Sequence, residues 1–115
     1  MSVVPLADLQ RGRCRPLDAT ARLQGPALVG QLAELAHWTV HDGTLQREFA
    51  FSDFHRTIGF VNAVAWMANA QDHHPELQLS YSRCTVRWHT HSAGGITLND
   101  FICAARADVL ADEGR

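Results

Sequence analysis

An Asp-Gly pair at residues 42–43 constrains the fold of this chain more than any other short feature of its sequence. Both residues of the tightest β-hairpin turn need positive φ angles, and Asp-Gly is among the pairs that adopt them most readily. The segments on either side, residues 38–42 and 44–51, are suited to extended structure. The sequence therefore predicts a β-hairpin here, and with it an antiparallel sheet.

On each side of this hairpin lies a segment whose apolar residues have helical spacing. Residues 26–37 begin with a proline, which the first helical turn tolerates, and their leucines recur three or four positions apart. Residues 54–71 show the same apolar spacing, and Ser52 or Asp53 can cap their first turn. We expect the second helix to stop before Pro75, because proline disfavours helical backbone in the residue that precedes it.

The C-terminal half repeats the order of hairpin and helix. Alternating apolar residues at 77–81 and 84–88 predict a second hairpin. A last helix is expected from Thr97, because Thr97 and Asp100 have the spacing of a capping box. The order helix, hairpin, helix, hairpin, helix predicts an α+β fold in which an antiparallel sheet carries its helices on one face.

The length of 115 residues is sufficient for one domain with a buried core. Residues 1–24 contain two prolines and a glycine and are expected to form an irregular N-terminal arm, which leaves residues 25–115 as the folded domain. No apolar stretch approaches the roughly 20 residues of a membrane-spanning helix, and the first residues lack the layout of a secretory signal. We therefore expect a cytoplasmic protein.

Charge and composition exclude several classes of function. The net charge is −2 and only three arginines cluster, near the N-terminus, so nucleic-acid binding is not expected. The three cysteines include no Cys-x-x-Cys pair, which argues against a zinc ribbon or a disulfide framework. The chain contains no lysine, which rules out Schiff-base chemistry and a P-loop phosphate lysine.

Four histidines fall within nineteen positions of one another, and this cluster is the main candidate for a functional site. His73 and His74 precede Pro75, whereas His89 and His91 lie two apart on an expected strand and should share one face. Three interpretations remain open at this point. The histidines are surface residues with local hydrogen bonds, or ligands of a metal, or groups that transfer protons to and from a bound small molecule.

The spacing HHP, five residues, Tyr81, nine residues, His91, eight residues, Asp100 resembles the pattern of the pterin-4a-carbinolamine dehydratases. The segments FSDFHRTIGFVNAVAWMANAQDHHPE and THSAGGITLNDF are similar to the middle helix and the last hairpin region of that family. The resemblance covers roughly residues 30–110. It favours proton transfer over the other two interpretations.

The resemblance implies a four-stranded antiparallel sheet with three helices, assembled into a homodimer or homotetramer. It also implies a hydro-lyase reaction, in which 4a-hydroxytetrahydrobiopterin loses water to give quinonoid dihydropterin during tetrahydrobiopterin recycling. The substrate is a small pterin, and the reaction needs neither a metal nor a redox cofactor, because two imidazoles in opposite protonation states suffice. No nucleic-acid or membrane partner is expected.

Carried over position by position, the resemblance makes His73, His74 and His91 the catalytic residues. His74 is the expected acid toward the hydroxyl group, and His73 or His91 is the base at N5 of the pterin. Asp100 is expected to orient a histidine or a pterin nitrogen, although the same residue also fits the capping box of the last helix. Pro75 is expected to fix the direction of the chain after the two histidines.

Two positions depart from the family pattern. Asn69 stands where an ionisable residue is usual, and Leu77 stands where many members have tryptophan. Asn69 lies one helical turn before His73, so we expect the two side chains to meet, without the charge that a carboxylate would supply. This departure motivates an alternative, a pterin-binding or protein-interaction module with little turnover. The weak His-x-His pattern leaves a metal-dependent hydrolase as a third possibility.

Overall fold

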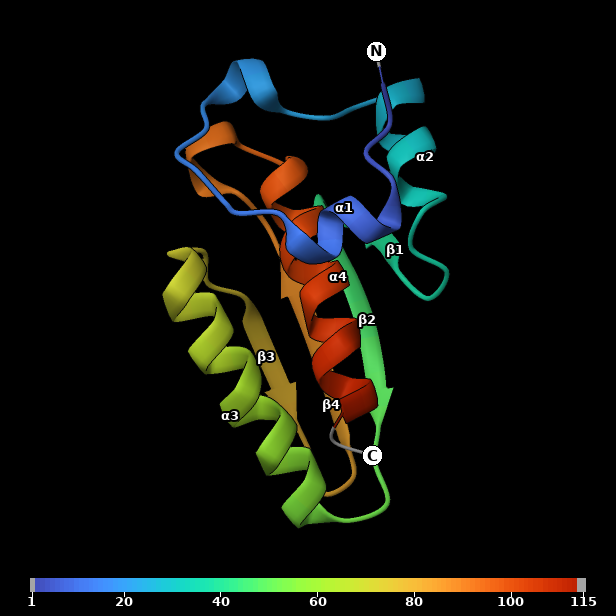
Figure 1. Ribbon diagram of the computed structural model, residues 1–115, viewed down its shortest axis with the longest axis vertical. Coiled ribbons are helices and arrows are strands. Elements are labelled where there is room, and N and C mark those ends of the chain that lie inside the picture. Colours follow the sequence, from blue (N-terminus) through green and yellow to red (C-terminus); the bar gives the residue numbers. More distant parts are fainter. Residues whose placement is uncertain (1, 114–115) are drawn as a thin grey trace.

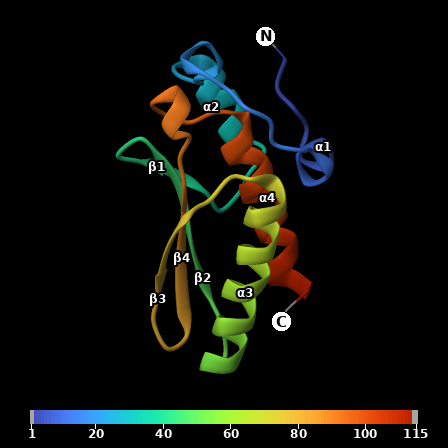
Figure 2. The ribbon, with the colours of Figure 1, turned by 90° about the vertical axis from the view of Figure 1, so that its left-hand side faces the viewer.

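Four antiparallel strands form one sheet in the order β1-β2-β4-β3, and the computed structural model describes residues 2–113 of the chain. The hairpin of β1 (Thr39–His41) and β2 (Thr44–Ala50) pairs through β2 with β4 (Arg83–Trp88), which also pairs with the edge strand β3 (Glu76–Leu79). The two longest helices pack against one side of this sheet, as Figures 1 and 2 show. The predicted α+β fold with its four-stranded antiparallel sheet is confirmed.

The first hairpin turns where the Asp-Gly pair predicts it. Asp42 and Gly43 have φ angles of 48° and 73°, so both occupy the left-handed region that a two-residue turn requires. The register that follows pairs Val40 with Leu45 across the turn and Phe49 with Cys84 across the centre of the sheet.

Two long helices, α3 (Phe54–Gln71) and α4 (Leu98–Glu113), cover the sheet on one face (Figure 2). Asp53 caps α3 by accepting a hydrogen bond from the backbone N–H of Arg56, so Asp53 and not Ser52 is the cap. The helix ends at Gln71, as predicted from Pro75.

The core lies between these helices and β2 and β4. The ring of Phe49 packs at 4.6 Å from the ring of Phe60 and at 5.9 Å from that of Trp38, measured between ring centroids. Alternation along the central strands turns one set of side chains inward, as predicted, and five of these are fully buried: Leu45, Phe49, Cys84, Val86 and Trp88. Helix α4 approaches closely because four of its buried positions are alanine: Ala104, Ala105, Ala107 and Ala111.

The first predicted helix is shorter than its apolar spacing indicates. Helix α2 (Pro26–Leu32) gives way to tight turns in which the N–H groups of Glu34 and Leu35 bond the carbonyls three residues back. Leu35 is still buried, so the apolar spacing reports burial of the segment rather than continuous α-helix. Helix α2 lies beyond one end of the sheet instead of on its face (Figure 1).

The prediction of an irregular arm is wrong for part of the N-terminal segment. Residues Leu6–Arg11 form helix α1, which packs against α4 and buries Leu9 completely, and Ala19–Ala21 form a short 3-10 turn, η1. A six-residue helix has too few turns to show a periodic pattern, and it is stabilised by packing more than by its own propensity. Within residues 2–113, no helix combines the length and hydrophobicity that crossing a membrane requires.

Candidate active site

The C-terminal end of α3 sends His73 and His74 in different directions. Asp72 follows the helix in the left-handed conformation, with φ 50° and ψ 41°, and the N–H of His73 bonds the carbonyl of Ala68 at 3.1 Å. This closing pattern usually uses glycine, and Asp tolerates the same backbone. The reversal lets the helix end sharply and turns the chain into β3.

His73 points inward and is held by a carboxylate. Its Nε2 lies 2.6 Å from Oδ1 of Asp100, and the two side chains are 11% and 0% exposed. The imidazole is stacked on the indole of Trp88, with 5.8 Å between ring centroids and 11° between planes. Burial lowers the pKa of His73, but the hydrogen bond to Asp100 and the charge of that carboxylate outweigh it, so the pKa is raised above its ordinary value.

The carboxylate of Asp100 both caps the first turn of α4 and holds the ring of His73. Its Oδ2 accepts the backbone N–H of Thr97 at 2.9 Å and the hydroxyl of Thr90 at 2.8 Å, while the Thr97 hydroxyl accepts the N–H of Asn99. The Thr97–Asp100 contacts are those of the predicted capping box at the start of α4. The other oxygen of the same carboxylate orients His73, so the two roles considered for Asp100 coexist.

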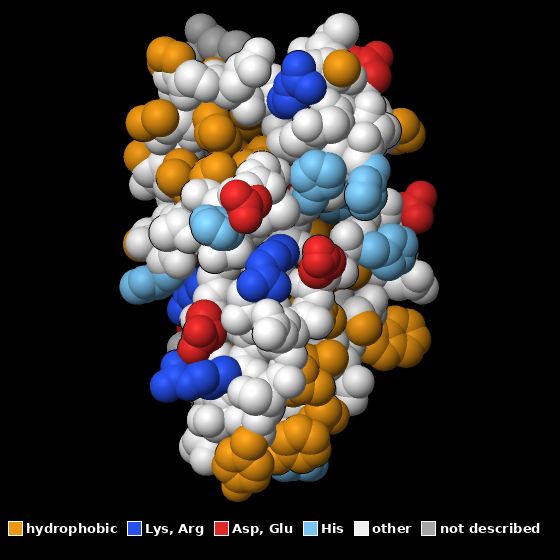
Figure 3. Space-filling view, turned by 180° about the vertical axis from the view of Figure 1, so that it is seen from behind, with side chains coloured by type: hydrophobic (Ala, Val, Ile, Leu, Met, Phe, Trp, Pro, Cys, Tyr) orange, Lys and Arg blue, Asp and Glu red, His pale blue; other side chains and the backbone are white. Residues whose placement is uncertain are grey.

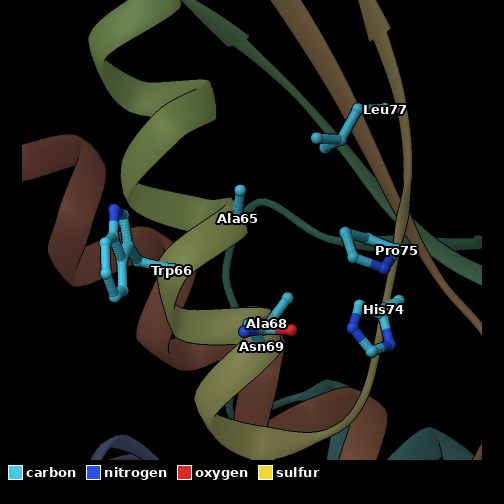
Figure 4. A pocket seen from close by; sticks show the side chains of 7 residues that line it. All are labelled: Ala65, Trp66, Ala68, Asn69, His74, Pro75 and Leu77. Atoms are coloured by element: carbon cyan, nitrogen blue, oxygen red, sulfur yellow. The ribbon is translucent and has the colours of Figure 1, made fainter.

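His74 lines a cavity of about 510 Å³ between the end of α3 and strand β3, shown in Figure 4. Pro75 and Leu77 stand beside it on the strand side, and Ala68 and Asn69 face it from the helix, whereas Trp66 points away from the strand. A volume of this size falls in the range of small-molecule sites. The cavity therefore combines one exposed imidazole with largely apolar walls.

The prediction that Asn69 meets His73 is not what the structure shows. Asn69 lines the same cavity as His74, while the hydrogen-bond partner of the His73 ring is Asp100. The predicted contact assumed that the helix continues through residue 73, but the left-handed residue Asp72 changes the direction of the chain first. An ionisable group at position 69 would therefore act on His74.

The prediction that His89 and His91 lie on one strand is also wrong. Strand β4 ends at Trp88, and the chain continues through an isolated bridge between Thr90 and Gly95 into the 3-10 turn η2 (His91–Ala93). The rings of His89 and His91 still meet edge to face, with 5.0 Å between centroids. Histidine side chains gather on the face of the sheet away from the helices, near the upper half of Figure 3.

A second, smaller cavity of about 220 Å³ opens beside His73. Its walls come from three parts of the chain: the N-terminal segment from Cys14 to Leu17, the end of α3, and the region around Thr90 and Asn99. The two adjacent histidines thus open onto different cavities. The sequence analysis did not single out Cys14, Thr90 or Asn99 as site residues. Each lines the cavity only because the fold brings separate segments together, and no short sequence pattern predicts that.

A metal site was the second interpretation of the histidine cluster. Among the residues that the structure describes, no three His, Cys, Asp or Glu side chains come together in an arrangement that could hold a metal ion. The Nε2 atom of His73 is already engaged by Asp100.

Comparison with known proteins assigns the family. The family model for pterin 4 alpha carbinolamine dehydratase matches residues 21–110. A protein of Chromobacterium violaceum with the provisional name pterin-4-alpha-carbinolamine dehydratase is 41% identical over 97 residues, covering 84% of this chain and 90% of its own. A protein of Xanthomonas campestris with the same provisional name is 40% identical over 112 residues, or 95% of each chain.

Solved structures agree with this assignment. A transcriptional coactivator/pterin dehydratase from Brucella melitensis superposes with a TM-score of 0.75 at 34% identity, over 78% of this chain and 98% of that one. A pterin dehydratase-like protein described as a RuBisCO assembly factor of the alpha-carboxysome shares the fold, with a TM-score of 0.57 at 22% identity over 67% of this chain and 92% of that one. The chain belongs to the pterin 4 alpha carbinolamine dehydratase family.

Proposed function

We propose that this protein is a hydro-lyase that removes water from 4a-hydroxytetrahydrobiopterin to give quinonoid dihydropterin. The observation that carries the proposal is the histidine pair at the end of α3. One imidazole is held by a buried carboxylate at 2.6 Å, and the next lines a cavity of about 510 Å³. Membership of the family identifies the class of ligand that such a pair would serve.

The reaction needs one proton donor and one proton acceptor. In our proposal His74 donates a proton to the 4a-hydroxyl group, so that the C4a–O bond breaks and the oxygen leaves as water. The electron pair of the N5–H bond forms the C4a–N5 double bond while a base removes the N5 proton. Positioned groups of this kind typically contribute 10²–10⁴-fold to a rate.

We assign the base to His73, which requires the bound pterin to extend from the cavity that His74 lines to the smaller cavity beside His73. Asp100 engages Nε2, so Nδ1 is the nitrogen that would take the proton, and the carboxylate stabilises the imidazolium that results. The pKa of His73 is raised by the same carboxylate. His91, which is exposed at the start of η2, is the second candidate for the base.

Stopped-flow ultraviolet spectroscopy of 4a-hydroxytetrahydropterin decay tests the proposal. We expect His74→Gln and His73→Gln each to lower the enzymatic rate about 10²-fold or more. The matched controls are His37→Gln and His41→Gln, which alter exposed histidines outside the site and should leave the rate unchanged. Equal effects of all four substitutions would contradict the assignment, and a full effect of His91→Gln with none of His73→Gln would move the base to His91.

The same assay separates the alternatives. A pterin-binding or protein-interaction module would bind a pterin, measured by fluorescence quenching, without accelerating its dehydration; the coactivator role named for the Brucella relative makes this the second candidate. Activity that disappears on chelation and returns with metal would instead indicate a metal-dependent enzyme. We further propose a cytoplasmic homodimer or homotetramer in tetrahydrobiopterin recycling, for which light scattering measures the assembly.

A further inference from the structure

Two cysteines that are 89 positions apart in sequence lie side by side beside the smaller cavity. The sulfur atoms of Cys14 and Cys103 are 3.5 Å apart, and all three cysteines of the chain are free thiols in this structure. Cys103 is fully buried on α4, whereas Cys14 is partly exposed and lines the cavity beside His73. We propose that a hydroperoxide oxidises Cys14 and that Cys103 then closes an intramolecular disulfide, which makes this pair a redox-sensitive modification site.

The two thiols differ in the way that this chemistry requires. The hydrogen bond with Cys103 lowers the pKa of Cys14, although burial acts in the opposite direction, and the charge of His73 lowers it further whenever that ring is protonated. The pKa of Cys103 is raised by the same hydrogen bond and by burial. Cys14 also lines the cavity, where a peroxide can reach it, whereas Cys103 is fully buried, so Cys14 is the group that reacts first and Cys103 is the partner that resolves the product.

The electron balance needs one equivalent of hydroperoxide. The Cys14 thiolate attacks the peroxide, so that an S–O bond forms, the O–O bond breaks, and the departing alkoxide or hydroxide takes up a proton. Cys103 then attacks the Cys14 sulfenic acid, which forms the S–S bond and releases the oxygen as water with the proton of Cys103. The two thiols lose two electrons and two protons in total, and the peroxide is reduced to an alcohol and water, or to two waters when it is hydrogen peroxide.

The disulfide would fasten the N-terminal segment to α4 at the wall of the cavity. The segment is already held there by non-covalent contacts, because the N–H of Cys14 bonds Oε1 of Gln71 at 2.7 Å and Asn99 exchanges hydrogen bonds with the backbone of Arg15. The sulfur atoms need to approach by roughly 1.5 Å to reach bonding distance, which is the difference between 3.5 Å and the usual bond length of about 2 Å.

The test treats the reduced protein with hydrogen peroxide and follows its intact mass and free thiols. We expect a loss of about 2 Da and of two thiols, reversed by dithiothreitol, because forming a disulfide removes two hydrogen atoms. Cys14→Ser should slow thiol loss at least about tenfold, since the thiol that lines the cavity is then missing. Cys103→Ala should leave Cys14 as a sulfenic acid that dimedone traps, with Cys103→Val as a second variant if the first does not fold.

Cys84 supplies the matched control within the same chain. It is buried in β4, and burial raises its pKa to about 11, so Cys84→Ala should oxidise like the wild type. Any of three results would overturn the proposal: a disulfide that includes Cys84, disulfide-linked dimers as the main product, or addition of oxygen without the expected loss of two hydrogen atoms. The readout is a mass and a thiol count, so it is independent of whether the protein dehydrates pterins.

Discussion

Replacing Asp100 by asparagine tests how the carboxylate controls His73. The buried carboxylate accepts from His73 through Oδ1 and from Thr97 N–H and the Thr90 hydroxyl through Oδ2. In the variant the single amide oxygen must take the Oδ2 place, because the backbone N–H of Thr97 can only donate. The amide NH₂ group then faces Nε2 of His73, which has to become an acceptor, so the proton of the neutral ring moves to Nδ1.

The magnitude follows from these contacts. A ring protonated at Nδ1 cannot take the N5 proton, so we expect the dehydration rate at pH 7 to fall about 10²-fold or more. The loss of a charged hydrogen bond in a buried site should also lower the free energy of unfolding by about 1–3 kcal/mol. The pKa of His73 should fall, because the carboxylate that raises it is gone.

Three measurements are needed for this variant: the stopped-flow rate, the free energy of unfolding in urea, and the ¹⁵N shifts of the His73 ring, which report its tautomer. Asp108→Asn is the matched control, because Asp108 also lies on α4 and bonds Trp38 and Arg47 but lies outside the site. That control should lose stability and keep its rate. A rate within about threefold of wild type in Asp100→Asn, despite a reversed tautomer, would refute His73 as the base.

Three further predictions concern the charge, pH dependence and packing of the fold. Asn69→Glu places a carboxylate on the wall of the cavity that His74 lines and should move the alkaline limb of the pH–rate profile to higher pH, whereas Ala70→Glu, at the next position of α3, should not. The folded-state pKa of His73 is raised above 6.5, so its contribution to stability is present below that pH and is lost as the pH rises through the folded-state value. The difference in unfolding free energy between wild type and His73→Gln, measured in urea, should therefore shrink as the pH rises above about 6.5; a difference that grew instead would contradict it. Phe49→Ala should destabilise the protein by about 3–5 kcal/mol in the same assay, because Phe49 is fully buried, whereas the half-exposed Phe54 should tolerate alanine at small cost.

Much of the fold could be predicted because its strongest signals are local. The Asp-Gly pair fixes the first hairpin by backbone geometry alone, Asp53 starts α3, and Pro75 marks the end of that helix within a few residues. The capping box at Thr97 also predicts a contact that the structure contains. In each case the residues that decide the structure are only a few positions apart.

The site could be predicted only in part, because its geometry depends on contacts between distant segments. The residue spacing singled out His73 and Asp100, yet nothing in that spacing indicated that they bond each other and not a ligand directly. Asp72, in the left-handed conformation, turns the chain after α3, and Asn69 then lines the same cavity as His74. The Cys14–Cys103 contact joins the N-terminal segment to the last helix, and only the folded chain brings the two thiols together.

The shared use of Asp100 ties the site to the integrity of one helical turn. The carboxylate is placed for His73 only while the first turn of α4 is formed, since its second oxygen is bound to the N–H of Thr97 at that turn. Fraying of this turn, a local opening that leaves the rest of the domain folded, would release the imidazole at the same moment. Hydrogen exchange at the Thr97 amide therefore reports the fraction of molecules in which His73 is correctly held.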